Sequence, residues 1–333
     1  MKIGLAGAGR IGAMHAEVLA RLDGVSEVVI ADVVADRARV VATNVGGRAV
    51  ETVKALFEAG LDGIVVAAAT DAHASLITAA VARGIPVFCE KPVAFDVEGT
   101  LEVIEAVEGS GVPVQVGFQR RFDPGYRQAR DTVQSGRLGW IHTLRSCTLD
   151  VAPPPADYIA TSGGFFRDCA VHDFDSIRWV TGREIVSVYA VGANRGDAFF
   201  ADHDDIDTAS AVLTLDDGAL AVVSCSRYNQ AGYDVRLEVL GQKGSIAVGL
   251  DDNCALESAE PGATFPVGIA HAAFPERFAA AYQAELRAFV GLVQHGGDSE
   301  CTPLDALQAF YAAEACELSR HEARPVSMSE VIR

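Results

Sequence analysis

Residues 163–175, GGFFRDCAVHDFD, carry ionisable side chains at a spacing that suits acid–base chemistry. If this segment is an α-helix at about 100° per residue, Asp168, His172 and Asp175 share a stripe roughly 60° wide. A histidine is suited to remove a proton near neutral pH, and a carboxylate one turn away can orient its ring or bind a hydroxyl. The same stripe could instead be a hydrogen-bonded contact between domains. The elements that surround it in the sequence are needed to distinguish these two interpretations.

The N-terminal stretch KIGLAGAGRIGAMHAEVLARL follows the pattern of a dinucleotide-binding turn. A short apolar strand precedes glycines spaced G-x-G-x-x-G, and a helical pattern follows them. Such glycines allow a tight turn, close approach of a pyrophosphate and close packing of the helix, whose N-terminus offers N–H groups to phosphates. A glycine-rich turn of another α/β fold is the alternative. We assign five residues of this turn to the cofactor: Gly7, Gly9, Arg10, Ile11 and Gly12.

The second predicted strand, SEVVIADV, brings an acidic residue to the place where the cofactor's ribose is bound. Asp32 follows Gly12 by about 20 residues, the position at which an acid accepts a hydrogen bond from the adenosine 2′-hydroxyl. Val33 and Val34 follow it, so no basic residue stands directly beside it to accept a 2′-phosphate, and Arg37 is the nearest exception. The sequence therefore predicts NAD in preference to NADP.

Strands and helices alternate as far as residue 118, which predicts a mostly parallel sheet with right-handed crossovers. Ligands of such sheets lie beyond the carboxyl ends of the strands. Lys91 directly follows the strand IPVFCE, although it could be an ordinary surface lysine, and His73 near a helix start could equally cap or pack. The residues assigned to the cofactor at these strand ends are Thr70, His73, Glu90, Lys91 and Gln119.

The remaining residues read as a different kind of domain. A helix over 124–136, an extended segment, a proline-rich loop and the GGFF helix precede several strands joined by the turns DDG and GQKG, and two helices end the chain. We therefore predict an α/β protein with a Rossmann domain over 1–118. An α+β domain over 119–333, with a large, mostly antiparallel open sheet, binds substrate and forms the oligomer. Because the predicted helices cover one sheet face only, the other should pair with another subunit.

Composition excludes several functions. The chain of 333 residues has 27 basic and 45 acidic side chains and a net charge of −18, which argues against nucleic-acid and anionic-membrane partners. Its seven cysteines are scattered without a C-x-x-C pair, which indicates reduced thiols and a cytoplasmic protein. No signal peptide or membrane span is visible.

Metal-binding motifs are not found in the sequence. ADHDDID (201–207) lacks the glycine and distal glutamate of a calcium loop, and no zinc spacing occurs, so no metal is predicted.

Five stretches together resemble the glucose–fructose oxidoreductase/inositol dehydrogenase (GFO/IDH/MocA) family, and within it the inositol 2-dehydrogenases. They are GAGRIG (7–12), EKP (90–92), GFQRRFDPGY (117–126), APPPADYI (152–159) and SGGFFRDCAVHDFD (162–175). The resemblance implies a homotetramer and an active site formed by Lys91, Asp168 and His172. More softly, it implies substrate contacts from these three residues and from Arg121, Asp150, Asp175, Tyr233 and Tyr282.

The expected reaction is oxidation of a neutral cyclic polyol, myo-inositol to 2-keto-inositol, with hydride transfer to NAD and His172 as the base. In TLDVAPPP, Leu149 and Val151 flank Asp150 where the resemblance implies an arginine–aspartate–proline run, so another inositol epimer, an aldose or a glycoside is the alternative substrate. A non-catalytic NAD-binding regulator would have no use for Lys91, Asp168 and His172 together. A glycosidase with tightly held NAD would form no net NADH.

Overall fold

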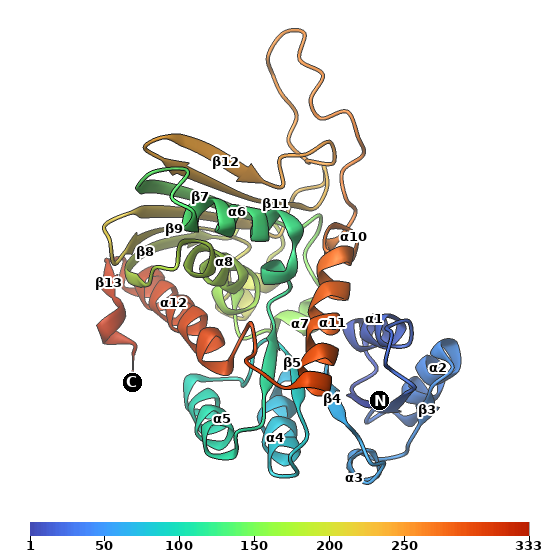
Figure 1. Ribbon diagram of the computed structural model, residues 1–333. Helices are drawn as coiled ribbons and strands as arrows, with labels where there is room; N and C mark the ends of the chain where they lie inside the picture. The colour runs from blue at the N-terminus through green and yellow to red at the C-terminus, as the bar shows by residue number, and fades with distance from the viewer. Residues whose placement is uncertain (333) are drawn as a thin grey trace. The chain divides into compact units, whose positions relative to one another are not determined.

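The computed structural model describes residues 1–332, which divide into two compact units (Figure 1). Met1–Phe122 and Ala280–Leu307 form the first, and Asp123–Ala279 with the chain from Gln308 onward forms the second. The expected domain 119–333 therefore differs from the second unit chiefly at 280–307. The reason is helix α11 (Ala279–His295), which contributes apolar side chains to the N-terminal core, namely Leu286, Phe289 and Val290.

The first unit is a six-stranded parallel sheet in the order β3-β2-β1-β4-β5-β6, the strand order of a Rossmann fold. Its strands are β1 (Lys2–Ala6), β2 (Glu27–Ala31), β3 (Arg48–Ala49), β4 (Gly63–Val66), β5 (Val87–Glu90) and β6 (Val114–Gly117). Its helices besides α11 are α1 (Arg10–Leu19), α2 (Ala35–Val45), α3 (Val53–Phe57), α4 (Thr70–Val81) and α5 (Val97–Ser110), with a 3₁₀ turn over Gln119–Phe122.

Local sequence explains these elements and the edge they create. The runs GIVV and VFC form β4 and most of β5 and are buried, as expected for strands covered on both faces. Helix α5 is capped at its N-terminus by Asp96, whose side chain accepts from the Gly99 N–H, and at its C-terminus by Gly111 in the left-handed conformation. Parallel pairing of β1, β4 and β5 brings the turns after these strands side by side.

The second unit contains a seven-stranded sheet in the order β12-β11-β7-β10-β9-β8-β13. The pair β7–β10 is parallel and the other pairs are antiparallel, which confirms the predicted mostly antiparallel sheet. Its strands are β7 (Ile141–Leu149), β8 (Ile185–Ala193), β9 (Thr208–Leu215), β10 (Leu220–Ser226), β11 (Asp234–Gly241), β12 (Gly244–Val248) and β13 (Val326–Ser327). Its helices are α6 (Pro124–Gln134), α7 (Ala156–Ile159), α8 (Val171–Thr181), α9 (Phe199–Asp202), α10 (Phe274–Arg277) and most of α12 (Pro303–Glu322).

The two faces of this second sheet differ. Helices α6 and α8 lie over one face (Figure 1). Side chains alternate between buried and exposed along much of β8, β9 and β10, and several that point away from the buried side are apolar: Tyr189, Val191, Val212, Leu220 and Val222. One face of the sheet therefore exposes an apolar surface within this chain. Among residues 1–332, no helix combines the length and the apolar character needed to cross a membrane.

Candidate functional site

The glycine-rich turn after β1 has the geometry that a dinucleotide needs. Gly7 has a φ of +100°, and a Cβ added there would overlap the main chain of Ala67. A Cβ on Gly12 would overlap the Gly7 carbonyl, whereas one on Gly9 would meet no atom within 4 Å. The turn is thus closed on its inner side and open above Gly9, at the start of α1. A pyrophosphate can approach the backbone there, so the residues fit NAD.

Asp32, directly after β2, is fixed beside this turn by two main-chain donors. Its Oδ2 accepts from the Ala8 N–H at 2.7 Å, and its Oδ1 accepts from the Val34 N–H at 2.7 Å. Its carboxylate is also 3.9 Å from the Arg37 guanidinium. Asp32 therefore presents a fixed negative charge at the position expected for the ribose, as the sequence predicts, and Arg37 compensates that charge only partly.

We expect kcat/KM with NAD to exceed kcat/KM with NADP by at least about 10-fold, because a 2′-phosphate would meet the Asp32 carboxylate. Asp32→Ala should reduce this ratio toward one, and Asp36→Ala, which removes an exposed carboxylate of α2, should leave it unchanged. Steady-state kinetics with both cofactors measures the ratio. Equal values for the unaltered protein would contradict the role assigned to Asp32.

The residues predicted at the ends of β4 and β5 have distinct surroundings. Glu90 accepts a hydrogen bond at 2.6 Å from the His15 imidazole, and Lys91 follows it at a partly exposed position. The two ring nitrogens of His73 lie 2.7 Å and 3.0 Å from the carbonyl oxygens of Pro92 and Ala68. His73 thus connects the loop after β4 to the loop that carries Lys91, a positioning role for this loop.

Arg121, assigned to the substrate by resemblance, is buried in the first unit. Its guanidinium donates to the Glu300 carbonyl at 2.9 Å and lies 3.2 Å from the Asp305 carboxylate. Burial alone would raise the pKa of Asp305, but Arg121 and the Thr302 donors outweigh burial and lower it. These partners give Arg121 a structural task, and its substrate contact stays a prediction. Gln119 is likewise buried, in the same 3₁₀ turn.

In the second unit, the segment predicted as one α-helix is a π-helix over Phe166–Ala170 that continues into α8. The prediction of regular α-helical spacing is therefore wrong over the π-helix, because its wider turn rotates Asp168 relative to His172. Single π turns inside α-helices are frequent at functional sites. His172 is partly exposed, whereas Asp175 is fully buried, and its predicted substrate contact remains untested.

Asp168 belongs to a cluster of charges that the sequence analysis missed in part. The buried Arg227 guanidinium donates to Asp168 Oδ2 at 2.7 Å and to Asp150 Oδ2 at 2.9 Å. The Tyr158 hydroxyl donates to Asp168 Oδ1 at 2.9 Å. The Phe165 ring lies 5.2 Å from the guanidinium carbon. Both carboxylate oxygens of Asp168 are therefore held, which fixes its orientation.

Arg227 directly follows β10, and Asp150 directly follows β7, its parallel neighbour in the sheet. Burial opposes the charge of Arg227, but the Asp168 and Asp150 carboxylates outweigh burial and raise the pKa of Arg227 well above its usual value. A sequence signal existed, since each residue directly follows a predicted strand. It could not be used, because the sequence does not reveal that these two strands run parallel.

The two tyrosines assigned to the substrate lie in different units. Tyr233 packs edge-on to Phe274 and Phe278 in the second unit. Tyr282, on α11, packs against the His15 ring in the first unit, with ring centroids 6.0 Å apart. Both tyrosines are largely buried, so their environments are those of packed aromatic side chains, and their substrate contacts stay predictions.

Comparison with known proteins matches both units. A family model described as an oxidoreductase family with an NAD-binding Rossmann fold matches residues 1–118, and the GFO/IDH/MocA C-terminal domain matches residues 126–247. The chain is 40% identical to a myo-inositol dehydrogenase of Streptomyces leeuwenhoekii, over 94% of this chain and 96% of that protein. It is 35% identical to an inositol 2-dehydrogenase of Rhizobium meliloti, over 99% of both.

Solved structures agree with these matches. A myo-inositol dehydrogenase from Corynebacterium glutamicum superposes with a TM-score of 0.90 at 36% identity, covering 98% of each chain. A scyllo-inositol dehydrogenase from Lactobacillus casei, solved with bound NAD(H) and scyllo-inositol, superposes with a TM-score of 0.89 at 30% identity over 99% of each chain. The predicted fold class and the predicted family resemblance are both confirmed.

Proposed function

Because the chain belongs to the GFO/IDH/MocA family of NAD-binding oxidoreductases, we propose that it oxidises a secondary hydroxyl of an inositol to a ketone. NAD is its cofactor. The observation that carries the proposal is the fixed Asp168 carboxylate one turn before a partly exposed histidine, in a chain similar to inositol dehydrogenases. Myo-inositol is the proposed substrate and 2-keto-inositol the product.

The side chains divide the chemistry among them. NAD, when bound, supplies the acceptor for the hydride. His172 removes the hydroxyl proton, for which an imidazole is suited near neutral pH. The Lys91 ammonium stabilises the negative charge that develops on the substrate oxygen. Asp168 cannot rotate freely, because Tyr158 and Arg227 hold its oxygens, so it binds a second substrate hydroxyl in one orientation.

A neutral polyol suits this set better than an anionic sugar does. Hydroxyl groups can donate to the carboxylates of Asp150 and Asp168, whereas a phosphate or carboxylate would be repelled by them. The net charge of −18 adds to this repulsion. Leu149 and Val151 beside Asp150 offer no polar side chain, so the inositol epimer is selected by the remaining polar groups.

NADH formation with a panel of inositols, aldoses and glycosides tests the proposal. Formation of NADH with myo-inositol, at a higher kcat/KM than with scyllo-inositol, glucose or a glycoside, is the expected result. A higher value with another polyol would revise the substrate within the same chemistry. Binding of NAD without NADH formation on any polyol would contradict the proposal and favour a regulator, and glycoside cleavage without net NADH would favour a glycosidase.

We propose that the apolar face of the second sheet joins four copies of the chain into a homotetramer. Five apolar side chains are exposed there on neighbouring strands, and such surfaces are usually covered by a partner. Val222→Glu, at the centre of this face, should dissociate the assembly, whereas Val40→Glu, on the exposed side of α2, should not. Light scattering that finds a monomer of the unaltered protein at micromolar concentration would contradict this expectation.

We propose that the protein works in the cytoplasm. All seven cysteines are free thiols, and most are buried. Burial is the main cause that raises the pKa of Cys147 to about 12, so this thiol stays protonated and unreactive at neutral pH. Free, unreactive thiols suit a reducing compartment.

A further inference from the structure

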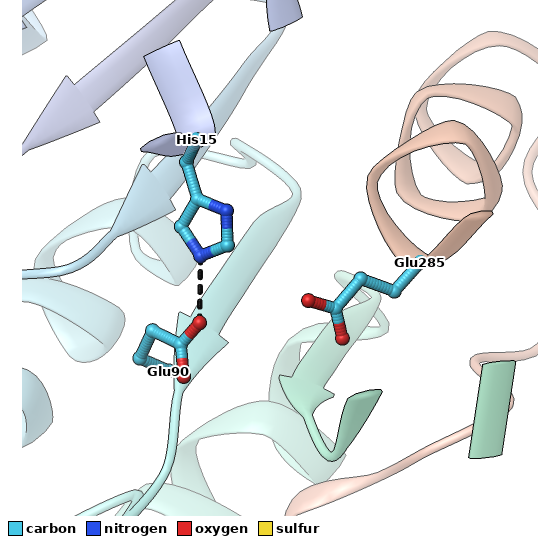
Figure 2. A group of neighbouring side chains, drawn as sticks. All are labelled: His15, Glu90 and Glu285. Carbon is cyan, nitrogen blue, oxygen red and sulfur yellow. Dashed lines mark hydrogen bonds and ion pairs between the residues drawn. The ribbon is translucent and has the colours of Figure 1, made fainter. Parts of the chain in front are cut away.

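Three side chains to which the proposed mechanism gives no chemical step converge inside the first unit, one of them being Glu90, which the sequence also predicts near the cofactor. His15 comes from α1, Glu90 from the end of β5 and Glu285 from α11 (Figure 2). One nitrogen or oxygen atom from each lies within 4.8 Å of the other two. The His15 Nε2 atom is 2.6 Å from Glu90 Oε1, and Figure 2 draws the Glu285 carboxylate directed toward this pair.

Glu285 is a buried carboxylate whose oxygens lack hydrogen-bond partners in the described chain. It is 0% exposed, and neither of its carboxylate oxygens has a hydrogen-bond partner among residues 1–332. Burial first, and the Glu90 charge second, raise the pKa of Glu285 well above its usual value. A buried carboxylate without a partner is costly, so its charge must be removed by a proton or compensated by a cation.

We propose that His15, Glu90 and Glu285 bind one divalent transition-metal ion, with Zn²⁺ or Mn²⁺ as the matching ions. One imidazole nitrogen and two carboxylate oxygens are a donor set that both ions accept. At metal–ligand distances of about 2.0–2.2 Å, the ligand atoms of a tetrahedral site lie roughly 3.3 Å apart. The present separations, 2.6 Å between His15 Nε2 and Glu90 Oε1 and up to 4.8 Å within the set, lie on either side of this value. Binding would therefore require the glutamate side chains to rotate and the His15 proton to reside on Nδ1.

Protonation of Glu285 is the alternative to a bound cation. It leaves more of the buried oxygen atoms without partners. Protonation removes one negative charge, but both Glu285 oxygens would still lack hydrogen-bond partners at their present positions. A cation at the centre of the three ligand atoms compensates the charge and occupies lone pairs of both carboxylates. A water molecule can complete the coordination shell, as it does in sites with three protein ligands.

Such an ion would join three elements that are far apart in the sequence. His15 and Glu90 are separated by 75 positions, and Glu285 lies on the helix that returns to this unit after residue 279. Sequence spacing could not reveal this set, because metal motifs are recognised by ligands close together along the chain. The ion would fix Glu90, and with it the start of the loop that carries Lys91.

The test uses the full-length protein, stripped of metal by a chelator and free of nucleotide. We expect one equivalent of Zn²⁺ or Mn²⁺ to bind per chain, measured by elemental analysis after gel filtration, and the melting temperature to rise by several degrees at saturation. Glu285→Gln keeps the size of the side chain but loses its charge, and it should weaken binding by at least about 100-fold. His15→Gln provides a second, independent loss of a ligand.

Glu105→Gln, which removes an exposed carboxylate from α5 of the same unit, is the matched control and should bind like the unaltered protein. The proposal is overturned if neither ion binds stoichiometrically to the unaltered protein. It is also overturned if Glu285→Gln and His15→Gln bind as tightly as the control, since the ion would then be adventitious. If Glu285 holds a proton instead, Glu285→Gln should melt at least as high as the unaltered protein and no ion should shift either one.

Discussion

Replacement of His172 by alanine should lower kcat by about 10²–10⁴-fold, the range expected when a general base is lost. NAD affinity should stay nearly unchanged, because we expect the dinucleotide to be bound by the glycine turn and Asp32, which lie in the other unit. The limb of the pH–rate profile near neutrality should disappear with the titrating imidazole. Steady-state kinetics across pH, together with NAD binding measured by fluorescence, checks all three expectations.

His142→Ala is the matched control, because His142 is an exposed histidine of β7 in the same unit. Its kcat should equal that of the unaltered protein. Thermal unfolding of both variants separates a catalytic role of His172 from a structural one. If folded His172→Ala turns over at a normal rate and only its melting temperature falls, the histidine is a packing residue and the mechanism proposed here is wrong.

Arg227→Met should destabilise the protein by about 3–5 kcal/mol, because it leaves two carboxylates close together without their shared cation. Asp168 and Asp150 both lose a charged hydrogen bond of less than 3 Å. The melting temperature should fall by roughly 5–15 °C, and the folded fraction should show a lower kcat, because Asp168 is no longer held in one orientation. Calorimetry and rates normalised to folded protein measure the two effects.

Arg183→Met removes an exposed arginine that pairs with surface carboxylates, and it should change stability by less than about 1 kcal/mol. Arg227→Lys keeps the positive charge but lacks the two guanidinium nitrogens that donate to separate carboxylates. It should therefore recover only part of the stability that Arg227→Met loses. Adding Asp150→Asn to Arg227→Met should recover stability by removing one of the two unpaired charges. Unfolding of Arg227→Met at the temperature of the unaltered protein would show that the cluster does not contribute to stability.

Local sequence patterns predict the fold of the first unit well, because the residues that form each pattern lie close together along the chain. A buried strand, three spaced glycines, a helix and an acidic residue after the second strand all lie within the first 32 residues. The structure places Asp32 beside the turn through two main-chain hydrogen bonds, as that pattern requires. The alternation of strands and helices up to residue 118 likewise suffices to predict the parallel sheet.

The rest of the site depends on contacts between distant segments. The pairing of Arg227 with Asp150 requires β7 and β10 to run parallel, in a sheet whose other strands pair antiparallel. The π-helix that rotates Asp168 has no signature in composition or periodicity. Glu285 reads as an ordinary polar residue on an amphipathic helix until α11 is placed against the Rossmann core. These features come from tertiary packing, which overrides local pattern.

The return of α11 to the first unit has a consequence for synthesis on the ribosome. The first 122 residues contain every strand of the Rossmann sheet, yet Leu286, Phe289 and Val290 of its core are translated much later. At about 5–20 residues per second, the nascent N-terminal sheet waits roughly 10–40 s for the helix that completes it. During this interval an apolar face of the sheet is open to chaperones and to other nascent chains. The nucleotide-binding unit thus begins to fold first but completes its core late. A chain that terminates before residue 280 would lack the helix that completes this core, and we expect cellular quality control to remove it.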